Sequence, residues 1–267
     1  MVLRPLRQLA PEPDAVALYE GWLSALRERL EDPSCDRNAL CAQVLRDLLY
    51  PQIDPSADPS RLPPATQAAL RNLDPRAVTL EPEYYEEIDE RRYYERKPLI
   101  WLWQMFDRSP LGGNVDLGVR FRRLLAPHVL GRVGRNFKCF HFVEMSFGYN
   151  LRVGDDVVIH RNVLLDDRGG IRIGNRVSIS DHASIFSHTH SIDDIVDVTN
   201  LETVLDDDVR ITYGATVLAG VHVGVQGMVG ARALATKDIR PYHVNVGVPA
   251  RPAKVKSTAP PEYRQGD

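Results

Sequence analysis

An aliphatic side chain returns every six residues through much of the C-terminal half of the sequence. The positions that carry it are Val153, Ile159, Leu165, Ile171, Ile173, Ile179, Ile185, Leu205, Ile211, Val217, Val223, Val229 and Ala235. An α-helix repeats every 3.6 residues and a plain strand every two, so neither predicts this spacing. Short strands that turn a corner at each sixth residue do predict it, because every side then sends one aliphatic side chain into a stacked core. The repeat predicts a parallel β-helix, which is a solenoid of short strands.

The six-residue step is interrupted in two ways. It slips by two residues between Leu151 and Val153 and again between Ile171 and Ile173, which we expect at corners between coils. It fails over residues 187–204, where SHTHSIDDIVDVTNLETV carries too many polar side chains for the side of a coil. We expect this segment to leave the solenoid as a loop. Loops held on rigid scaffolds commonly carry functional sites.

The N-terminal third has helical periodicity instead. Residues 14–31 and 37–49 place apolar side chains along one helical stripe, with Asp14 as the expected N-cap of the first helix. A proline-rich linker over 51–64 and a short helix at 65–73 are predicted to follow. These segments carry no recognisable chemistry.

Two further stretches precede the solenoid. Residues 81–97 mix both charges with four tyrosines. We interpret them as a solvated helix whose tyrosines lie against a neighbouring surface, and an aromatic sugar-binding surface is the alternative. The run 98–106 is the most apolar in the chain, and we expect it to cover the first coil because an open end of a repeat stack needs a cap. The sequence thus predicts an α-helical region at 1–110, a β-helix at 111–256 and a tail at 257–267.

Composition limits the classes of partner. The chain has 33 basic and 36 acidic residues, which gives no reason to expect binding to nucleic acid or to an anionic membrane. Three cysteines at no ligand-like spacing favour a reducing compartment over a disulfide framework. Neither a signal-peptide run nor 18 consecutive apolar residues is present in the sequence. We therefore expect a cytoplasmic protein without a membrane span.

Residues 131–256 resemble the hexapeptide-repeat acyltransferases, and most closely the maltose, galactoside and nodulation-factor O-acetyltransferases. The resemblance is carried by IRIGNRVSISDHASIFSHTHSIDD (171–194), ATVLAGVHVGVQGMVGARALATKDI (215–239) and VGVPARPAK (246–254). It implies a left-handed superhelix with three six-residue sides per coil. It also implies a homotrimer that binds acetyl-CoA in clefts between adjacent solenoids and transfers the acetyl group to a hydroxyl of a sugar or related small acceptor.

The resemblance implies that His190 is the general base, because the string THSID (189–193) matches the family's histidine motif. Transfer of an acetyl group from a thioester to a hydroxyl needs a base that takes the hydroxyl proton. Imidazole suits this role, since its ordinary pKa of about 6.5 leaves a large neutral fraction at pH 7. His188 is a candidate acceptor contact, and no metal is expected. The alternative interpretation is that both are surface histidines of a loop.

The other expected site residues follow from the same resemblance. Acceptor hydroxyls are expected to meet Asn162 and one of Asp166 and Asp167; the spacing leaves open which of the two, and a corner turn is the structural alternative for both. Tyr213 stands where the family has a small residue, which leaves the width of the donor cleft and the acyl length open. The expected donor contacts, from the pantetheine to the CoA phosphates, are Tyr213, Gly214, Gly230, Ala231, Thr236, Lys237 and Arg251.

Two other classes of function remain open from the sequence. A zinc-dependent hydratase of the carbonic-anhydrase type uses a similar solenoid, and the candidate ligands are His160, His182, His188, His190 and His222. That type lacks the Thr-Lys-Asp and Gly-x-Pro-Ala-Arg endings found here. A non-catalytic trimeric scaffold is the second alternative. The order of helices before a solenoid also resembles serine acetyltransferase, although the SHTHSIDD pattern favours the sugar-directed branch.

Overall fold

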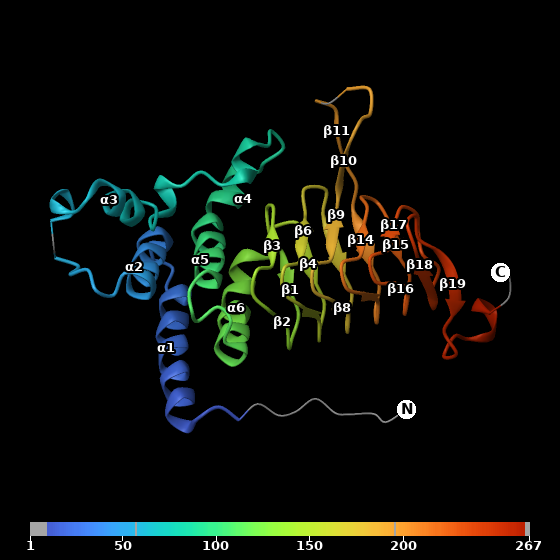
Figure 1. Cartoon of the computed structure of the whole chain (residues 1–267), viewed down its shortest axis with the longest axis horizontal. Helices are drawn as coiled ribbons and strands as arrows, with labels where there is room; N and C mark the ends of the chain where they lie inside the picture. Colours follow the sequence, from blue (N-terminus) through green and yellow to red (C-terminus); the bar gives the residue numbers. More distant parts are fainter. Residues whose placement is uncertain (1–9, 57, 195, 265–267) are drawn as a thin grey trace.

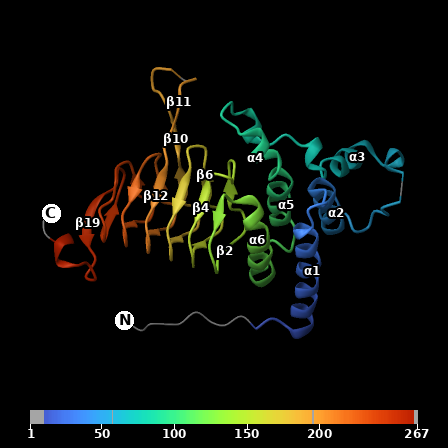
Figure 2. The same cartoon turned by 180° about the vertical axis from the view of Figure 1, so that it is seen from behind.

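A computed structural model describes residues 10–56, 58–194 and 196–264. Helices are packed at one end of the molecule and a β-solenoid of about six turns extends away from them (Figures 1 and 2). The helices are α1 (Pro13–Glu31), α2 (Arg37–Leu49), α3 (Pro64–Arg71), α4 (Glu90–Tyr94), α5 (Lys97–Asp107) and α6 (Val115–Val129), with 3₁₀ turns at η1 (Pro59–Arg61), η2 (Pro75–Ala77), η3 (Glu81–Tyr84) and η4 (Pro261–Tyr263). The predicted solenoid is confirmed.

Three parallel sheets form the sides of the solenoid. The first contains β1 (Arg132–Val133), β4 (Leu151–Val153), β7 (Ile171–Ile173), β12 (Thr203–Leu205) and β15 (His222–Val223). The second contains β2 (Lys138–Cys139), β5 (Val158–Ile159), β8 (Ser178–Ile179), β13 (Arg210–Ile211), β16 (Met228–Val229) and β18 (His243–Val246), with β19 (Arg251–Val255) antiparallel at its edge. The third contains β3 (Glu144–Met145), β6 (Leu164–Asp166), β9 (Ser184–Phe186), β14 (Thr216–Val217) and β17 (Leu234–Ala235).

The length of a coil changes along the solenoid. Arg132 pairs with Arg152, 20 residues further on, whereas Val204 pairs with His222 after only 18. The longer coils explain the slips in the sequence repeat. In β4 both Leu151 and Val153 point inward and are buried, with Arg152 exposed between them. The family pattern of three six-residue sides therefore holds for the coil that follows the polar interruption, and the coils before the interruption are each two residues longer.

Helix α6 closes the open end of the solenoid. It packs directly against β1 and β2, and α5 packs on α6 and α2 in the next layer (Figure 1). We expected the apolar run of α5 to lie on the first coil, and this is wrong because α6 occupies that position. The run is buried among helices instead, with Leu99, Leu102 and Phe106 fully covered.

Two local helix predictions also need correction. Asp14 is not the N-cap of α1; Glu12 holds that position, Pro13 begins the helix and Asp14 lies in its first turn. Residues 81–97 do not form one helix, because the chain makes the turn η3, then α4, and then enters α5 at Lys97. The helix predicted at 37–49 is confirmed, and the Asp36 carboxylate caps it by accepting from the backbone N–H of Asn38 and Ala39.

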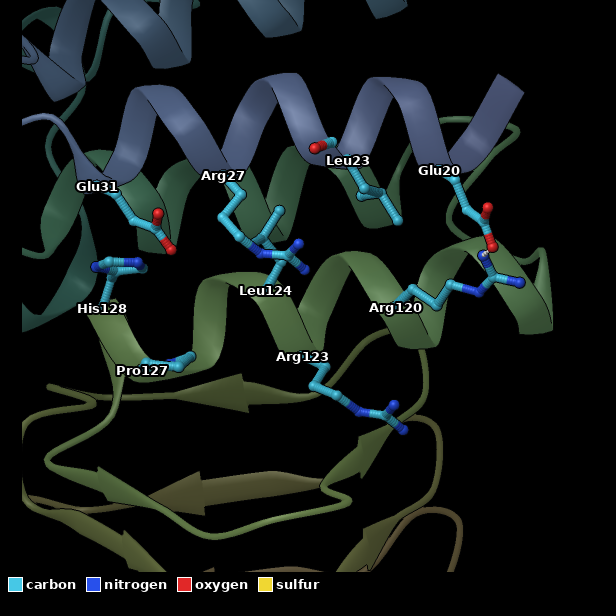
Figure 3. Close-up of a pocket in the computed structure, with 10 residues that line it drawn as sticks. Glu20, Leu23, Arg27, Glu31, Arg120, Arg123, Leu124, Pro127 and His128 are labelled. Carbon is cyan, nitrogen blue, oxygen red and sulfur yellow. Dashed lines mark ion pairs between the residues drawn. The ribbon is translucent and has the colours of Figure 1, made fainter. Parts of the chain in front are cut away.

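A groove of about 700 Å³ runs between α1 and α6 (Figure 3). Leu23 and Leu124 line the groove together with several charged side chains. An ion pair joins Arg120 of α6 to Glu20 of α1 at 3.5 Å. This groove lies in the helical layer, away from the hairpin that carries the two histidines (Figure 1). None of the helices in the described ranges has the length and apolar content that a bilayer crossing needs.

Candidate functional site

The polar interruption of the repeat is a two-stranded hairpin that projects from the solenoid (Figure 1). Strand β10 (His188–His190) follows β9 almost directly and pairs antiparallel with β11 (Val198–Asn200). Alternate residues of a strand share a face, so His188 and His190 lie on the same side of β10. Their rings contact each other edge to face, with centroids 5.2 Å apart. The hairpin therefore presents two adjacent imidazoles at its root.

Asp166 orients the first of these imidazoles. Its carboxylate Oδ2 accepts a hydrogen bond from His188 Nδ1, while its Oδ1 accepts from Ser146 Oγ at 3.1 Å. Asp166 is only 4 % exposed, at the end of β6. With Nδ1 as the donor, His188 keeps its Nε2 lone pair as an acceptor. This carboxylate–imidazole pair fixes the ring and holds the base of the hairpin against the coil before it.

Both histidines open onto a cleft of about 810 Å³. His190 is exposed there, whereas His188 has 17 % of its side chain accessible. The N-terminal region forms part of the cleft wall, which the sequence did not predict. The lining residues are Glu81, Tyr84, Tyr85, Glu86, Glu87, Arg168, His188, His190, Val196, Asp197 and Val198.

Asp167 has different surroundings from Asp166. It is fully buried, and its carboxylate accepts hydrogen bonds from the backbone N–H of Phe147 at 2.7 Å and of Asn150 at 3.1 Å. Burial raises the pKa of Asp167 to about 6, although these backbone donors oppose the shift. The side chain therefore ties two successive coils together inside the protein, and of the two aspartates Asp166 is the one that faces the histidines.

The raised pKa of Asp167 predicts how the free energy of unfolding changes with pH. Between pH 4 and pH 6 the unfolded chain releases the Asp167 proton before the folded chain does, so this carboxyl makes the protein less stable as the pH rises. Urea unfolding should show the stability of wild type relative to Asp167→Asn falling by about 2 kcal/mol from pH 4 to pH 7, at about 1.4 kcal/mol per pKa unit. Asp155→Asn is the matched control with the opposite sign, because hydrogen bonds from Arg135 lower the pKa of Asp155. Equal slopes for the two variants would contradict the assignment.

The remaining acceptor candidate lies at another corner. Asn162 precedes β6 whereas Asp166 ends it, so the two residues lie at opposite ends of this strand and at different corners of the solenoid. Asn162 has a left-handed backbone conformation with φ of 56°, and so does Gly214 in its turn, at 63°. Backbone hydrogen bonds link this corner from coil to coil, including Gly214 N–H to Asp181 O and Arg232 N–H to Tyr213 O. A single chain therefore does not bring Asn162 to His190.

Most expected donor contacts follow the Asn162 corner. Tyr213 is 45 % exposed there. Its ring contacts the His182 ring edge to face, with the ring centroids 5.4 Å apart. Ala231 is exposed in the turn before β17, and Gly230 beside it is buried. A Cβ at Gly230 would lie 2.6 Å from Val246 Cγ1, so the close approach of β18 requires glycine there.

The other expected donor residues lie near the C-terminal end of the solenoid. Thr236 and Lys237 follow β17, and they therefore lie at the same corner of the solenoid as Asp166, which ends β6. Both are exposed. Arg251 is exposed at the start of β19. Within one chain, the structure thus brings together Asp166, His188 and His190, and it places the donor candidates along later coils.

Arg168 is the cleft residue that the sequence analysis missed. It is 7 % exposed and lies in the turn after β6, where its Nε donates to Glu87 Oε1 at 2.5 Å. The tyrosines of residues 81–97 were the only sequence signal for this wall, because they gave the alternative prediction of an aromatic sugar-binding surface. Nothing in the spacing of the chain indicated that Glu87 and Arg168 meet, because 81 residues separate them. Among the described residues of this single chain, no three His, Cys, Asp or Glu side chains are grouped to hold a metal ion.

Comparison with known proteins finds acetyltransferases that are similar to this chain, although no family model matches the sequence. A putative acetyltransferase of Schizosaccharomyces pombe is 33 % identical over 116 residues, which are 42 % of this chain and 56 % of that protein. The galactoside O-acetyltransferase of Lactococcus lactis is 26 % identical over 174 residues, covering 62 % of this chain and 81 % of that one. A hexapeptide-repeat acetyltransferase from Vibrio cholerae, solved in complex with acetyl-CoA, superimposes with a TM-score of 0.53 at 25 % identity, covering 62 % of this chain and 87 % of that one.

The chain is similar in sequence and in fold to the hexapeptide-repeat acetyltransferases. The match to the Schizosaccharomyces pombe protein spans a little over half the length of that relative, whereas the matches to the other two span most of theirs. These comparisons each cover no more than 62 % of this chain. The cleft wall formed by residues 81–87 is a feature of this chain's own structure.

Proposed function

We propose that this protein transfers an acetyl group from acetyl-CoA to a hydroxyl of a sugar or related small acceptor, with His190 as the general base. The observation that carries the proposal is the pair of imidazoles at the root of the hairpin, one of them held by a buried carboxylate, facing an open cleft. The named activities of the galactoside O-acetyltransferase and of the acetyl-CoA-bound structure support it. A cytoplasmic location fits the same proposal.

The chemistry needs one proton acceptor and one place for the thioester. His190 takes the proton of the acceptor hydroxyl as its oxygen forms a bond to the acetyl carbonyl carbon. The carbon–sulfur bond then breaks, and the CoA thiolate takes the proton back from the imidazolium. The products are an acetyl ester and free CoA, so the histidine ends each cycle in its starting state. Asp166 and His188 keep the neighbouring ring and the hairpin root fixed while this happens.

We propose that a second copy of the chain completes the site. Asn162, Tyr213, Gly214 and Ala231 follow one corner of the solenoid, and the histidines stand at another. In a homotrimer with threefold symmetry, every such corner can face the hairpin of the neighbouring copy. Acetyl-CoA then lies between two solenoids, with Thr236, Lys237 and Arg251 near its phosphates. The segment boundaries near residues 110 and 256 remain part of this proposal; the first precedes α6, and β1 begins at Arg132.

His188 is a second candidate for the base. The Asp166 carboxylate that accepts from its Nδ1 orients the ring and leaves Nε2 as the proton acceptor, which is the arrangement of a histidine base held by a third group. His190 is favoured because it is the more exposed of the two and matches the family's histidine motif. Single substitutions of the two histidines separate these assignments.

The direct test of the function is an assay of thiol release from acetyl-CoA with a panel of small acceptors. The panel contains a neutral sugar (methyl β-galactoside), a cationic sugar (glucosamine), an amino acid (serine) and an antibiotic (chloramphenicol), each of which carries a hydroxyl. We expect thiol release with the galactoside that persists after dialysis against a chelator. Carbon dioxide hydration that the chelator abolishes would support the zinc hydratase. If acetyl-CoA neither reacts nor raises the melting temperature, the scaffold alternative is supported, since a bound ligand stabilises the folded protein.

A further inference from the structure

We propose that the segment 81–88 of the helical region forms the acceptor-binding wall of the site and selects neutral or cationic sugar rings over anionic ones. This inference rests on the proposed acetyl transfer and adds a specificity element from outside the solenoid. The segment reaches over from the helical end toward the hairpin (Figure 1), and five of its residues line the cleft beside both histidines.

Arg168 fixes the segment to the solenoid. Its guanidinium donates to Glu87 and stacks over the Tyr85 ring, with 3.9 Å between Cζ and the ring centroid. The Tyr85 hydroxyl in turn donates to Glu81 Oε1 at 2.5 Å. These contacts are mostly covered, because Arg168 is 7 % exposed and 27 % of the Glu87 side chain is accessible. A partly desolvated Arg–carboxylate pair with a stacked ring orders its segment, so the wall is in place before a substrate arrives.

Tyr84 gives the wall a binding surface. It is 81 % exposed at the cleft, although the adjacent Tyr85 is packed against Arg168 and Phe147. A tyrosine ring offers a flat apolar face with a hydroxyl at its end, which suits the C–H face and the hydroxyls of a pyranose. Because His190 lines the same cleft, a ring that stacks on Tyr84 is held beside the proposed base.

The charges of the cleft select against anions. Its one arginine among the described lining residues, Arg168, is already paired with Glu87, and His188 is bonded to the Asp166 carboxylate. Glu86 and Asp197 line the same cleft, and both are exposed. A carboxylate or phosphate on the acceptor would meet these groups without a further arginine or lysine among the described lining residues to offset them, whereas a neutral or amino sugar would not be repelled.

The first test compares acceptor kinetics in variants of one tyrosine. Tyr84→Ala should raise KM for galactose by about tenfold, equivalent to about 1.4 kcal/mol of lost acceptor binding, with KM for acetyl-CoA unchanged. Tyr84→Phe should stay close to wild type because it keeps the ring. Tyr94→Ala is the matched control, since Tyr94 is half exposed and lies outside the cleft lining. Unchanged KM for galactose in Tyr84→Ala would overturn the proposed wall.

The second test uses three sugars that differ in charge on one ring. Wild type should prefer galactose and galactosamine to galacturonate by at least about tenfold in kcat/KM, and Glu86→Lys should narrow that gap. Equal use of the three sugars would overturn the charge selection.

Binding without turnover separates this proposal from the proposed function. Saturation-transfer NMR with galactose and the full-length protein needs no acetyl-CoA. Binding that Tyr84→Ala weakens supports the wall even if no acetyl transfer occurs, in which case the proposed function alone fails. Acetyl transfer to galactose with full activity in Tyr84→Ala has the opposite meaning: the function stands and the wall is rejected.

Discussion

Replacing His190 by alanine is expected to lower the turnover of acetyl transfer at least about a hundredfold, the usual size of a general-base contribution. Without the imidazole, water or another weak base must take the hydroxyl proton as the acceptor attacks the thioester. Folding should not change, because His190 is exposed on the hairpin and its ring is not part of the core. The measurement is the initial rate of thiol release at saturating galactoside and acetyl-CoA, with the oligomeric state checked by gel filtration.

His188→Ala and Asp166→Ala provide the comparison for this prediction. If Asp166 only positions the hairpin through His188, both variants should lose less activity than His190→Ala and should resemble each other, because each breaks the same hydrogen bond. A loss of at least a hundredfold in His188→Ala together with a small loss in His190→Ala would reassign the base to His188. Retained turnover in all three variants would reject imidazole catalysis in this cleft.

Arg122→Met is expected to destabilise the protein by about 3–5 kcal/mol, the usual cost of leaving one partner of a buried ion pair unpaired. Arg122 is 1 % exposed on α6 and pairs with Asp107 at the end of α5, where Nε to Oδ1 measures 2.8 Å. It also donates to the backbone oxygens of Gly112 and Cys139. Asp107 itself accepts from the Phe142 N–H of the first coil. One ion pair thus joins two helices to the solenoid, and urea unfolding should report its loss.

Arg120→Met is the matched control on the same helix. Arg120 pairs with Glu20 and Asp116, but 30 % of its side chain is accessible, so its loss should cost less than about 1 kcal/mol (Figure 3). A second variant, Arg122→Met with Asp107→Leu, should recover part of the stability because it removes the stranded carboxylate. Similar losses for Arg122→Met and Arg120→Met would contradict the view that this pair anchors the helical cap.

The solenoid was predictable because its core obeys one short rule. Residues such as Ile159, Ile179 and Ile211 each fill the same inward position of successive coils, and a local period of six exposes that arrangement directly. The hairpin was predictable for the converse reason, since SHTHSIDD has too few apolar side chains to fill the inward positions of a coil side. The extra length of the early coils was also visible in the sequence, because the six-residue step slips by two where Leu151 and Val153 both point inward.

The cleft wall and the cap could not be predicted in the same way. Glu87 and Arg168 are 81 residues apart, and a contact between distant segments leaves no periodic signal. Helix α6 covers the first coil through the buried Arg122, and a lone arginine in an amphipathic helix looks like a solvated residue until its partner is known. The difference between Asp166 and Asp167 has the same origin. Asp166 ends β6 and Asp167 follows it, and only the structure shows which of the two meets the histidine.

The shared site between copies is tested most directly by mixing two inactive variants. His190→Ala lacks the proposed base, and Ala231→Trp should block the donor cleft at the opposite corner, so each alone should be inactive while still forming trimers. After unfolding and refolding together in equal amounts, random mixed trimers should recover about a quarter of wild-type activity, because a threefold ring of two variants keeps one intact site. Activity no greater than that of the separate variants, with mixed trimers shown to be present, would mean that His190 and the donor cleft belong to one chain and would contradict the account.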